Sequence, residues 1–340
     1  MNKSLLIKKF AEPLRLYDLA RVLTRRSPRI LMYHRFSENP RPGYVSAQAF
    51  EHQLVYLQKK YHLVSMTELV RGLRGDTPLN PNTIALTVDD GYADFYEVAF
   101  PILKRMGLPA TIFVTTRFAD GNFWLWPDII SYVLSNASSL IEDVQAGDLA
   151  VRAGLLSLCD RSDLWLPIVS YLLTLPDAEK HRWIQRFARS AQVDIPQSPP
   201  MEYGAASWTQ LHEMQRHGIE IGGHTATHPS LGRVTLAQLK AEVAECKNAL
   251  DRNLGERERQ FCYPNGQPQD LNEDVKAAVR EGGFASSVVA FYDRNALNDL
   301  YELRRYSASE DNFQFLKAIN GIELLASRLL DSHNRLTWQF

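Results

Sequence analysis

The stretch ALTVDDGYAD, residues 85–94, joins an apolar strand pattern to two adjacent carboxylates and a glycine. Asp-Gly is a strong turn signal, because glycine accepts a positive φ and aspartate bonds to its own backbone. Neighbouring carboxylates repel each other, so Asp89 and Asp90 cost free energy unless a cation or a reaction uses them. The stretch therefore predicts either an ordinary turn or a site at the end of a strand.

Short runs rich in β-branched and aromatic residues recur along the chain and alternate with longer helical patterns. The predicted strands are residues 29–34, 83–88, 110–115, 219–223, 260–264, 284–290 and 302–307. Strand–helix alternation is typical of α/β proteins with a parallel sheet. About seven such strands in one chain predict a deformed (β/α) barrel.

One region interrupts this alternation. Residues 117–206 carry helical, leucine-rich sequence, which we interpret as a mostly helical insertion in a barrel of residues 29–310. Loops that follow barrel strands lie at the catalytic face, so the insertion is either a lid or substrate-selecting wall, or extra scaffold. The ends of the chain, residues 1–28 and 311–340, are expected to form an amphipathic helical segment and a helical tail.

The composition is that of a globular protein. The chain has 340 residues, a net charge of −1 and 45% hydrophobic residues. This length allows a large core, and the lack of basic excess argues against nucleic acid as a partner. Nothing in the sequence fixes the oligomeric state. The widely spaced Cys159, Cys246 and Cys262 favour buried thiols in a reducing compartment over a disulfide framework.

The N-terminal segment, residues 1–28, mixes leucines with lysines and arginines. It has no apolar run long enough for a signal peptide or a membrane span, so a cytoplasmic location is expected. Its helix either packs on the barrel or makes a peripheral contact with the anionic inner face of a membrane.

Two histidines four residues apart follow the predicted strand 219–223. His224 and His228 would lie on one side of a single helical turn, which suits two ligands of one metal ion as well as it suits surface histidines. One carboxylate from another strand end would complete a His, His, Asp set with an open position, as in catalytic zinc-type sites. A second, unbound carboxylate would then accept a proton from water.

A further turn signal follows the predicted strand 260–264. The sequence RQFCYPNGQ, residues 259–267, places Pro-Asn-Gly after an apolar run. An ordinary turn explains this pattern. At the rim of a metal site, the same turn would expose backbone N–H groups that hold the oxyanion of a tetrahedral intermediate.

Three motifs, in order and each after a strand, resemble those of the polysaccharide deacetylases, the NodB-homology proteins or carbohydrate esterase family 4. They are TVDDG (87–91), HTATH (224–228) and YPNG (263–266). Val88 stands where the family typically has phenylalanine. The resemblance covers residues 29–116 and about 207–310.

This resemblance implies a deformed barrel that hydrolyses N-acetyl groups from amino sugars with one divalent metal ion. Zn²⁺ suits two histidines and one aspartate best, and the same ligands accept Co²⁺, Ni²⁺ or Mn²⁺. The implied roles are general base for Asp89, metal ligands for Asp90, His224 and His228, backbone oxyanion donor for Asn265, and substrate contact for Tyr263.

The chain also departs from the family pattern. The arginine that often opens the third motif is absent, and Arg305 in the strand 302–307 is a candidate to orient the base, or a surface ion pair. The late Asp-Trp motif is not evident. The late histidine that usually supplies the general acid is missing as well. His34, at the end of the first strand, is our candidate for that acid, because the first and last strands are neighbours in a closed barrel. A histidine with a purely structural hydrogen bond would show the same pattern. His333 is a weaker candidate for the acid.

Trp124 and Trp126 open the insertion, where they either stack on sugar rings or anchor the insertion to the barrel.

The sequence supports three functions in descending order. The first is a metal-dependent hydrolase that removes N-acetyl groups from amino sugars of a polysaccharide or glycan precursor. The second is a deformylase or deacetylase of a lipid-linked amino sugar at the cytoplasmic membrane face, which the basic N-terminal helix favours. The third is a non-catalytic glycan-binding barrel, which would have lost the base or a metal ligand, whereas all four positions are intact.

Overall fold

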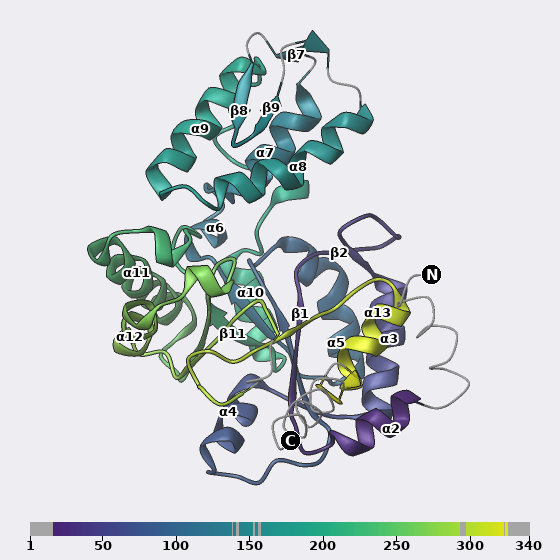
Figure 1. The fold of residues 1–340 in the computed structure, drawn as a ribbon. Helices are drawn as coiled ribbons and strands as arrows, with labels where there is room; N and C mark the ends of the chain where they lie inside the picture. The colour runs from purple at the N-terminus through teal and green to yellow at the C-terminus, as the bar shows by residue number, and fades with distance from the viewer. Residues whose placement is uncertain are drawn as a thin grey trace, which may run out of the picture.

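The chain folds around a parallel β-sheet that curves into a deformed barrel (Figure 1). The computed structural model describes residues 16–137, 139–140, 143–151, 154–155, 158–292, 297–322 and 324–325. The strands of the sheet are β1 (Arg29–Tyr33), β4 (His62–Val64), β5 (Thr83–Val88), β6 (Thr111–Val114), β11 (Glu220–Gly223), β12 (Gln260–Cys262), β13 (Ser286–Val288) and β14 (Tyr306–Ser307). They lie in the order β13-β12-β11-β6-β5-β1-β14, and β4 pairs with β5. The seven predicted strands are confirmed, and β4 is an addition.

The central strands are buried on both faces. Every residue of β1 and β5 is buried, which is expected where helices cover a parallel sheet and most of the strand residues are apolar. Because β14 pairs in parallel with β1, the last strand lies beside the first. Just before β14, Leu303 pairs with Val288 of β13, so this segment bridges the two edges of the sheet and brings the barrel close to closure.

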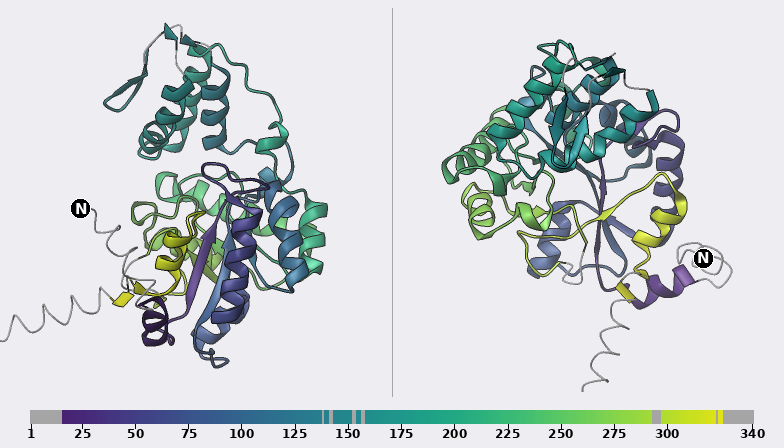
Figure 2. Two further views of the ribbon diagram at one scale, coloured as in Figure 1. Left: turned by 90° about the vertical axis from the view of Figure 1, so that its right-hand side faces the viewer. Right: turned by 45° about the horizontal axis from the view of Figure 1, so that its top comes forward.

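Helices surround the strands (Figure 2). They are α2 (Leu16–Leu23), α3 (Ala47–Lys60), α4 (Met66–Arg74), α5 (Phe100–Met106), α6 (Thr116–Ala119), α10 (Trp208–Arg216), α11 (Leu236–Leu254), α12 (Glu273–Glu281) and α13 (Asn312–Ile319). Several begin with side-chain caps. In α4, for example, Ser65 and Glu68 form a reciprocal capping box, which satisfies two backbone N–H groups of the first turn. A π-helical turn, η1 (Phe95–Ala99), precedes α5, and the short strands β2 (Phe36–Ser37) and β3 (Val45–Ser46) pair in front of α3.

The insertion forms a second packed unit above one end of the barrel (Figure 1). It contains α7 (Trp126–Asn136), α8 (Leu158–Leu172), α9 (Asp177–Ser190), the hairpin of β8 (Val144–Ala146) and β9 (Leu149–Val151), and the pair β7 (Ser139–Leu140) and β10 (Gly154–Leu155). Its helices bury a core of their own, in which Ile130, Ile168 and Phe187 are fully buried. The insertion therefore packs as a unit and can hold side chains in fixed positions over the barrel.

The N-terminal helix α2 packs Tyr17 and Ala20 against the barrel but leaves apolar side chains exposed. Leu19 and Leu23 are more than half exposed. Residues 1–15, which carry most of the predicted basic segment, lie outside the described residues. Among the described residues, no helix is both long enough and apolar enough to cross a membrane.

Candidate active site

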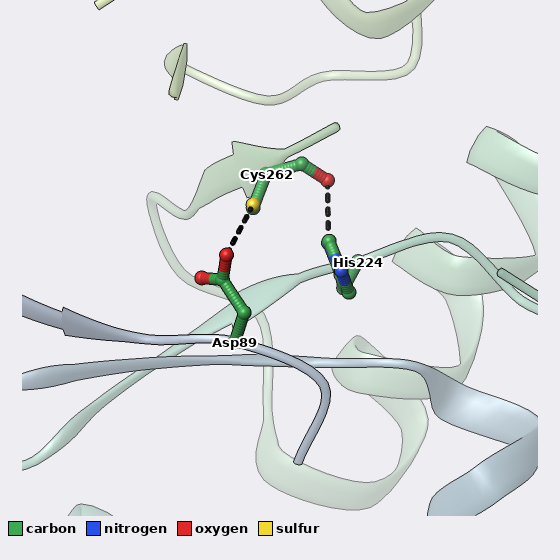
Figure 3. A group of neighbouring side chains, drawn as sticks. All are labelled: Asp89, His224 and Cys262. Carbon is green, nitrogen blue, oxygen red and sulfur yellow. Dashed lines mark hydrogen bonds between the residues drawn. The ribbon is translucent and has the colours of Figure 1, made fainter. Parts of the chain in front are cut away.

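The carboxyl ends of β5, β11 and β12, strands of one parallel sheet in which β6 lies between β5 and β11, bring the predicted motif residues together. Asp89 follows β5, His224 follows β11 and Cys262 ends β12, and their side chains lie close together (Figure 3). Asp89 and His224 line a cavity of about 580 Å³ between the barrel and the insertion. The barrel lines it with His34, Asp89, Asp90, His224, His228 and Asn265 among others, and the insertion with Leu125, Pro127, Asp128, Ser131, Trp165 and Val169 among others.

Asp90, His224 and His228 form a compact set of potential metal ligands. Asp90 Oδ1 lies 3.2 Å from Nε2 of each histidine, and the three donor atoms lie within 4.8 Å of one another. Asp90 and His228 both have positive φ, 75° and 60° respectively. Non-glycine residues adopt this region at some cost, and such strain clusters at functional sites. Here the unusual backbone turns both side chains toward one point.

The surroundings of His224 prepare one ring nitrogen for a metal. Its Nδ1 lies 2.8 Å from the carbonyl oxygen of Cys262 (Figure 3). A carbonyl only accepts, so Nδ1 carries the proton and donates it, and Nε2 is left to face Asp90. Glu242 accepts hydrogen bonds from the N–H groups of Ala226 and Thr227 and so fixes the loop between the two histidines. Histidine ligands are oriented in this way by a second hydrogen bond, so these residues fit a divalent metal ion.

Burial and pairing shift the pKa values of this set. Burial alone would raise the pKa of Asp90, but hydrogen bonds from both imidazoles outweigh it and hold that pKa well below its usual range. Burial also lowers the pKa of His228. At His224 burial acts in the same direction, but the contacts with Cys262 and Asp90 outweigh it and raise the pKa. Without a cation, His224 and Asp90 therefore form a charged pair.

Arg305 holds Asp89 in a buried, two-pronged ion pair. Its Nη1 and Nη2 donate to the two carboxylate oxygens of Asp89 over 2.7 and 2.6 Å, and its Nε donates to the carbonyl of Val289 over 2.8 Å. Burial pushes the pKa of Asp89 upward, but the guanidinium outweighs it, so the pKa is lowered. The structure thus places a guanidinium from the last strand against the predicted base, while Cys262 fills the start of the third motif.

The other predicted site residues line the same cavity. His34 Nε2 lies 3.7 Å from Asp89 Oδ2, and its side chain is 46% exposed. Asn265 has a φ of 59°, and its backbone N–H donates to no oxygen of the described residues. The buried hydroxyl of Tyr263 donates to the carbonyl of Tyr301 over 2.9 Å, so the ring is held in place at the cavity wall.

The two tryptophans lie elsewhere. Trp124 and Trp126 are buried and are not among the residues that line the cavity. Trp124 donates from Nε1 to the carbonyl of Pro196 over 2.8 Å, and Trp126 packs in the core of the insertion. Both sets of contacts lie within the insertion, so neither ring lines the cavity and neither contact joins the insertion to the barrel. His333 lies outside the described residues.

Sequence reasoning missed a polar group on the cavity wall. Tyr92 donates a 2.8 Å hydrogen bond to Asp128 Oδ2, and the Arg35 guanidinium lies 3.7 Å from the centre of the Tyr92 ring. Burial raises the pKa of Asp128 to about 7, against the charge of Arg35 and the hydrogen bond from Tyr92, while Asp90 and Asp94 add to the rise. The position of Tyr92 directly after the first motif could have marked it as a site residue. Asp128 lies in the insertion, and no sequence pattern there indicates a site.

Comparison with known proteins identifies relatives along most of the chain. The polysaccharide deacetylase family model matches residues 76–148 and 173–286, more than half of the chain. YxkH of Bacillus subtilis, a polysaccharide deacetylase by name, is 23% identical over 260 residues, which cover 76% of this chain and 63% of that protein. The poly-beta-1,6-N-acetyl-D-glucosamine N-deacetylase of Escherichia coli is 37% identical over 67 residues, 19% of this chain and 10% of that protein. The chain thus spans less than two thirds of the length of these relatives.

Solved structures share the fold. The Streptococcus pyogenes deacetylase PplD in complex with acetate has a TM-score of 0.56 at 19% identity, with 88% of this chain and 97% of that chain covered. IcaB from Ammonifex degensii has a TM-score of 0.56 at 18% identity, with 87% and 97% covered. These likenesses confirm the deformed barrel. Together with the match to the family model, the three motifs at the strand ends show that this chain belongs to the polysaccharide deacetylase family.

Proposed function

We propose that this protein is a metal-dependent N-deacetylase that acts on amino sugars of a polysaccharide or glycan precursor. One observation carries the proposal: Asp89, held ionised by Arg305, lies beside the set of Asp90, His224 and His228 at one cavity. Family membership supports hydrolysis of an acyl group. The name of the Escherichia coli relative supports an N-acetylated amino sugar as the substrate.

Asp90, His224 and His228 would hold the metal, and Zn²⁺ suits this donor set best. When bound, such an ion acts as a Lewis acid and lowers the pKa of a water molecule. Its positive charge would also offset the repulsion between the adjacent carboxylates of Asp89 and Asp90.

Each remaining residue takes a role that its position supports. Asp89, with a lowered pKa, accepts a proton from the attacking water at its carboxylate. Asn265 lines the cavity, and its backbone N–H, which donates to no oxygen of the described residues, would donate to the oxyanion that forms from the acyl carbonyl. His34 then donates a proton to the departing amine nitrogen, and its partly exposed ring allows reprotonation from water.

The proposal is tested by pairing metal content with acetate release. Wild type, Asp89→Asn, Asp90→Asn and the exposed insertion variant Asp148→Asn would be assayed on β-1,6-linked oligomers of N-acetylglucosamine. We expect Asp89→Asn to keep its metal and lose at least about a hundredfold in kcat, Asp90→Asn to lose the metal, and Asp148→Asn to match wild type. A wild-type protein that binds no divalent metal and releases no acyl group would refute the hydrolase assignment.

A lipid-linked amino sugar at the cytoplasmic membrane face is a second candidate substrate. The exposed apolar side chains of α2 favour it, since Leu19 is 55% and Leu23 57% exposed. Sedimentation with phosphatidylglycerol vesicles tests the membrane contact. Leu19→Glu with Leu23→Glu should abolish binding, whereas Glu202→Gln, at an exposed position far along the sequence, should leave it unchanged. Equal sedimentation of all variants would refute the contact.

A further inference from the structure

The insertion contributes one carboxylate to the cavity that the proposed reaction does not use. Asp128 lies in the first turn of α7, and its side chain is buried at the cavity wall. Oδ2 accepts the hydrogen bond from the Tyr92 hydroxyl over 2.8 Å. Oδ1 accepts no hydrogen bond from any residue that the structure describes. It is not one of the fully buried oxygens that lack a partner, so it opens to the cavity that Asp128 lines.

A ligand that fills the cavity would cover this carboxylate oxygen. A covered polar atom costs free energy unless it gains a hydrogen-bond partner, so the ligand has to offer Oδ1 a donor. The Arg35 guanidinium does not fill this role, because its Nε donates to Asp94 over 2.6 Å and its Nη2 to the carbonyl of Glu202 over 2.8 Å. Asp128 Oδ1 is therefore available to whatever enters the cavity.

The same cavity contains the proposed reaction site, so a sugar that reacts there lies within reach of both walls. The barrel supplies Asp89, Asp90 and the two histidines, and the insertion supplies Asp128 beside the apolar Pro127 and Trp165. Sugars present hydroxyl and N–H donors around an apolar ring face. One acceptor beside apolar side chains is a common way to fix the orientation of such a ligand.

We propose that Asp128 is a substrate-positioning residue that accepts a hydrogen bond at Oδ1 from one hydroxyl or amide N–H of the bound amino sugar. This inference rests on the proposed function for its ligand class, an N-acylated amino sugar. It assigns the insertion a role in selecting the substrate. The bond to Tyr92, which directly follows Gly91 of the first motif, keeps the carboxylate aligned with the barrel.

Affinity in a non-hydrolysing background tests this role without relying on turnover. Asp89→Asn would be titrated calorimetrically with a β-1,6-linked N-acetylglucosamine disaccharide, alone and combined with Asp128→Ala, Asp128→Asn or Asp148→Ala. At a pH above the pKa of Asp128, which is about 7, the carboxylate is charged, and a hydrogen bond to a charged group supports about a tenfold or greater loss of affinity in Asp128→Ala. We expect partial recovery in Asp128→Asn and no change in Asp148→Ala, whose side chain is exposed.

Sugar analogues separate positioning from mere support of the fold. The panel would contain monodeoxy disaccharides and one in which an ester oxygen replaces the amide N–H. If Asp128 accepts a hydrogen bond from one donor group of the sugar, the analogue that lacks this group should bind weakly to the Asp89→Asn parent protein. The same analogue should bind no more weakly to the double variant Asp89→Asn with Asp128→Ala. A uniform loss for every sugar, an unchanged affinity in Asp128→Ala, or no binding of any sugar by the parent would each overturn the inference.

The two proposals fail in different ways. If wild type releases no acetate while the binding pattern holds, the hydrolase assignment fails and the role of Asp128 stands. If wild type releases acetate but Asp128→Ala binds every sugar like its parent, the role of Asp128 fails alone.

Discussion

The ion pair between Arg305 and Asp89 makes the sharpest test of the site. Replacing Arg305 by methionine keeps a long apolar side chain but leaves the buried carboxylate of Asp89, 3% exposed, without its cation. Removal of one partner of a buried pair typically costs about 3–5 kcal/mol, because the other charge stays desolvated. The carbonyl of Val289 also loses the Nε hydrogen bond, so we expect the upper half of that range.

The same substitution should change the pH dependence of catalysis. A cation in contact lowers the pKa of an aspartate by about 1–3 units. Without the guanidinium, the pKa of Asp89 rises, so less of the base is ionised at acidic pH. The acidic limb of the kcat/KM profile should therefore move to higher pH by a similar amount.

Urea unfolding and pH–rate profiles of wild type and three variants would check both results. Arg304→Met is the matched control, because its guanidinium bonds to the carbonyl and carboxylate of Glu302. Arg305→Met combined with Asp89→Asn should recover part of the lost stability, because no unpaired charge is left buried. It should recover no activity, because the proposed base is absent. If Arg305→Met unfolds like Arg304→Met and its acidic limb does not move, the orienting role of Arg305 is refuted.

Three further outcomes follow from the structure. A proton on His224 competes with a metal ion, and the pKa of His224 is raised. The affinity for Zn²⁺, measured by competition with a chelator, should therefore fall about tenfold for each pH unit of acidification. An affinity that is constant from pH 8 to pH 6 would contradict this. The pKa of Asp128 is about 7 in the folded protein, against an ordinary value of 3.8 for aspartate. The folded state therefore binds a proton that the unfolded state has released, and the free energy of unfolding falls as pH rises through this window. From pH 5 to pH 8, the free energy of unfolding of Asp128→Asn should gain about 2–3 kcal/mol relative to wild type in urea unfolding, and parallel plots of this free energy against pH would refute the shift. A Cβ on Gly222 would lie 2.5 Å from the Phe113 ring and 2.7 Å from a backbone oxygen, so Gly222→Ala should cost about 1–3 kcal/mol by overpacking, and an unchanged unfolding midpoint would contradict it.

Sequence patterns were sufficient for the central strands of the barrel. The runs that became β1 and β5 are mostly apolar and rich in β-branched and aliphatic residues, which is the pattern of strands buried on both faces of a parallel sheet. The strand β4 escaped prediction because it has three residues, begins with the exposed His62 and exists through its pairing with β5. The small hairpin of β8 and β9 was likewise hidden within a region whose pattern is helical.

The cavity could be predicted only on its barrel side. Asp90 and His224 follow β5 and β11, two strands of one parallel sheet with β6 between them, and the carboxyl ends of such strands meet at one face of the barrel. The opposite wall depends on how the insertion packs over the barrel, and this packing leaves no periodic signal. Asp128 was therefore invisible, while Trp124, an aromatic residue near a site, suggested sugar stacking and is instead hydrogen-bonded within the fold.

Closure of the barrel explains how a site can be kept while its residues move along the chain. The family pattern places an arginine in the third motif and a histidine late in the sequence, and this chain has Cys262 and no such histidine at those positions. Because β14 pairs with β1, groups on the first and last strands meet at the same edge. Arg305, directly before β14, donates to Asp89, and Nε2 of His34, directly after β1, lies 3.7 Å from Oδ2 of the same carboxylate. The proposed reaction needs a cation and an acid near that carboxylate, and a barrel offers several strand ends from which each can be supplied.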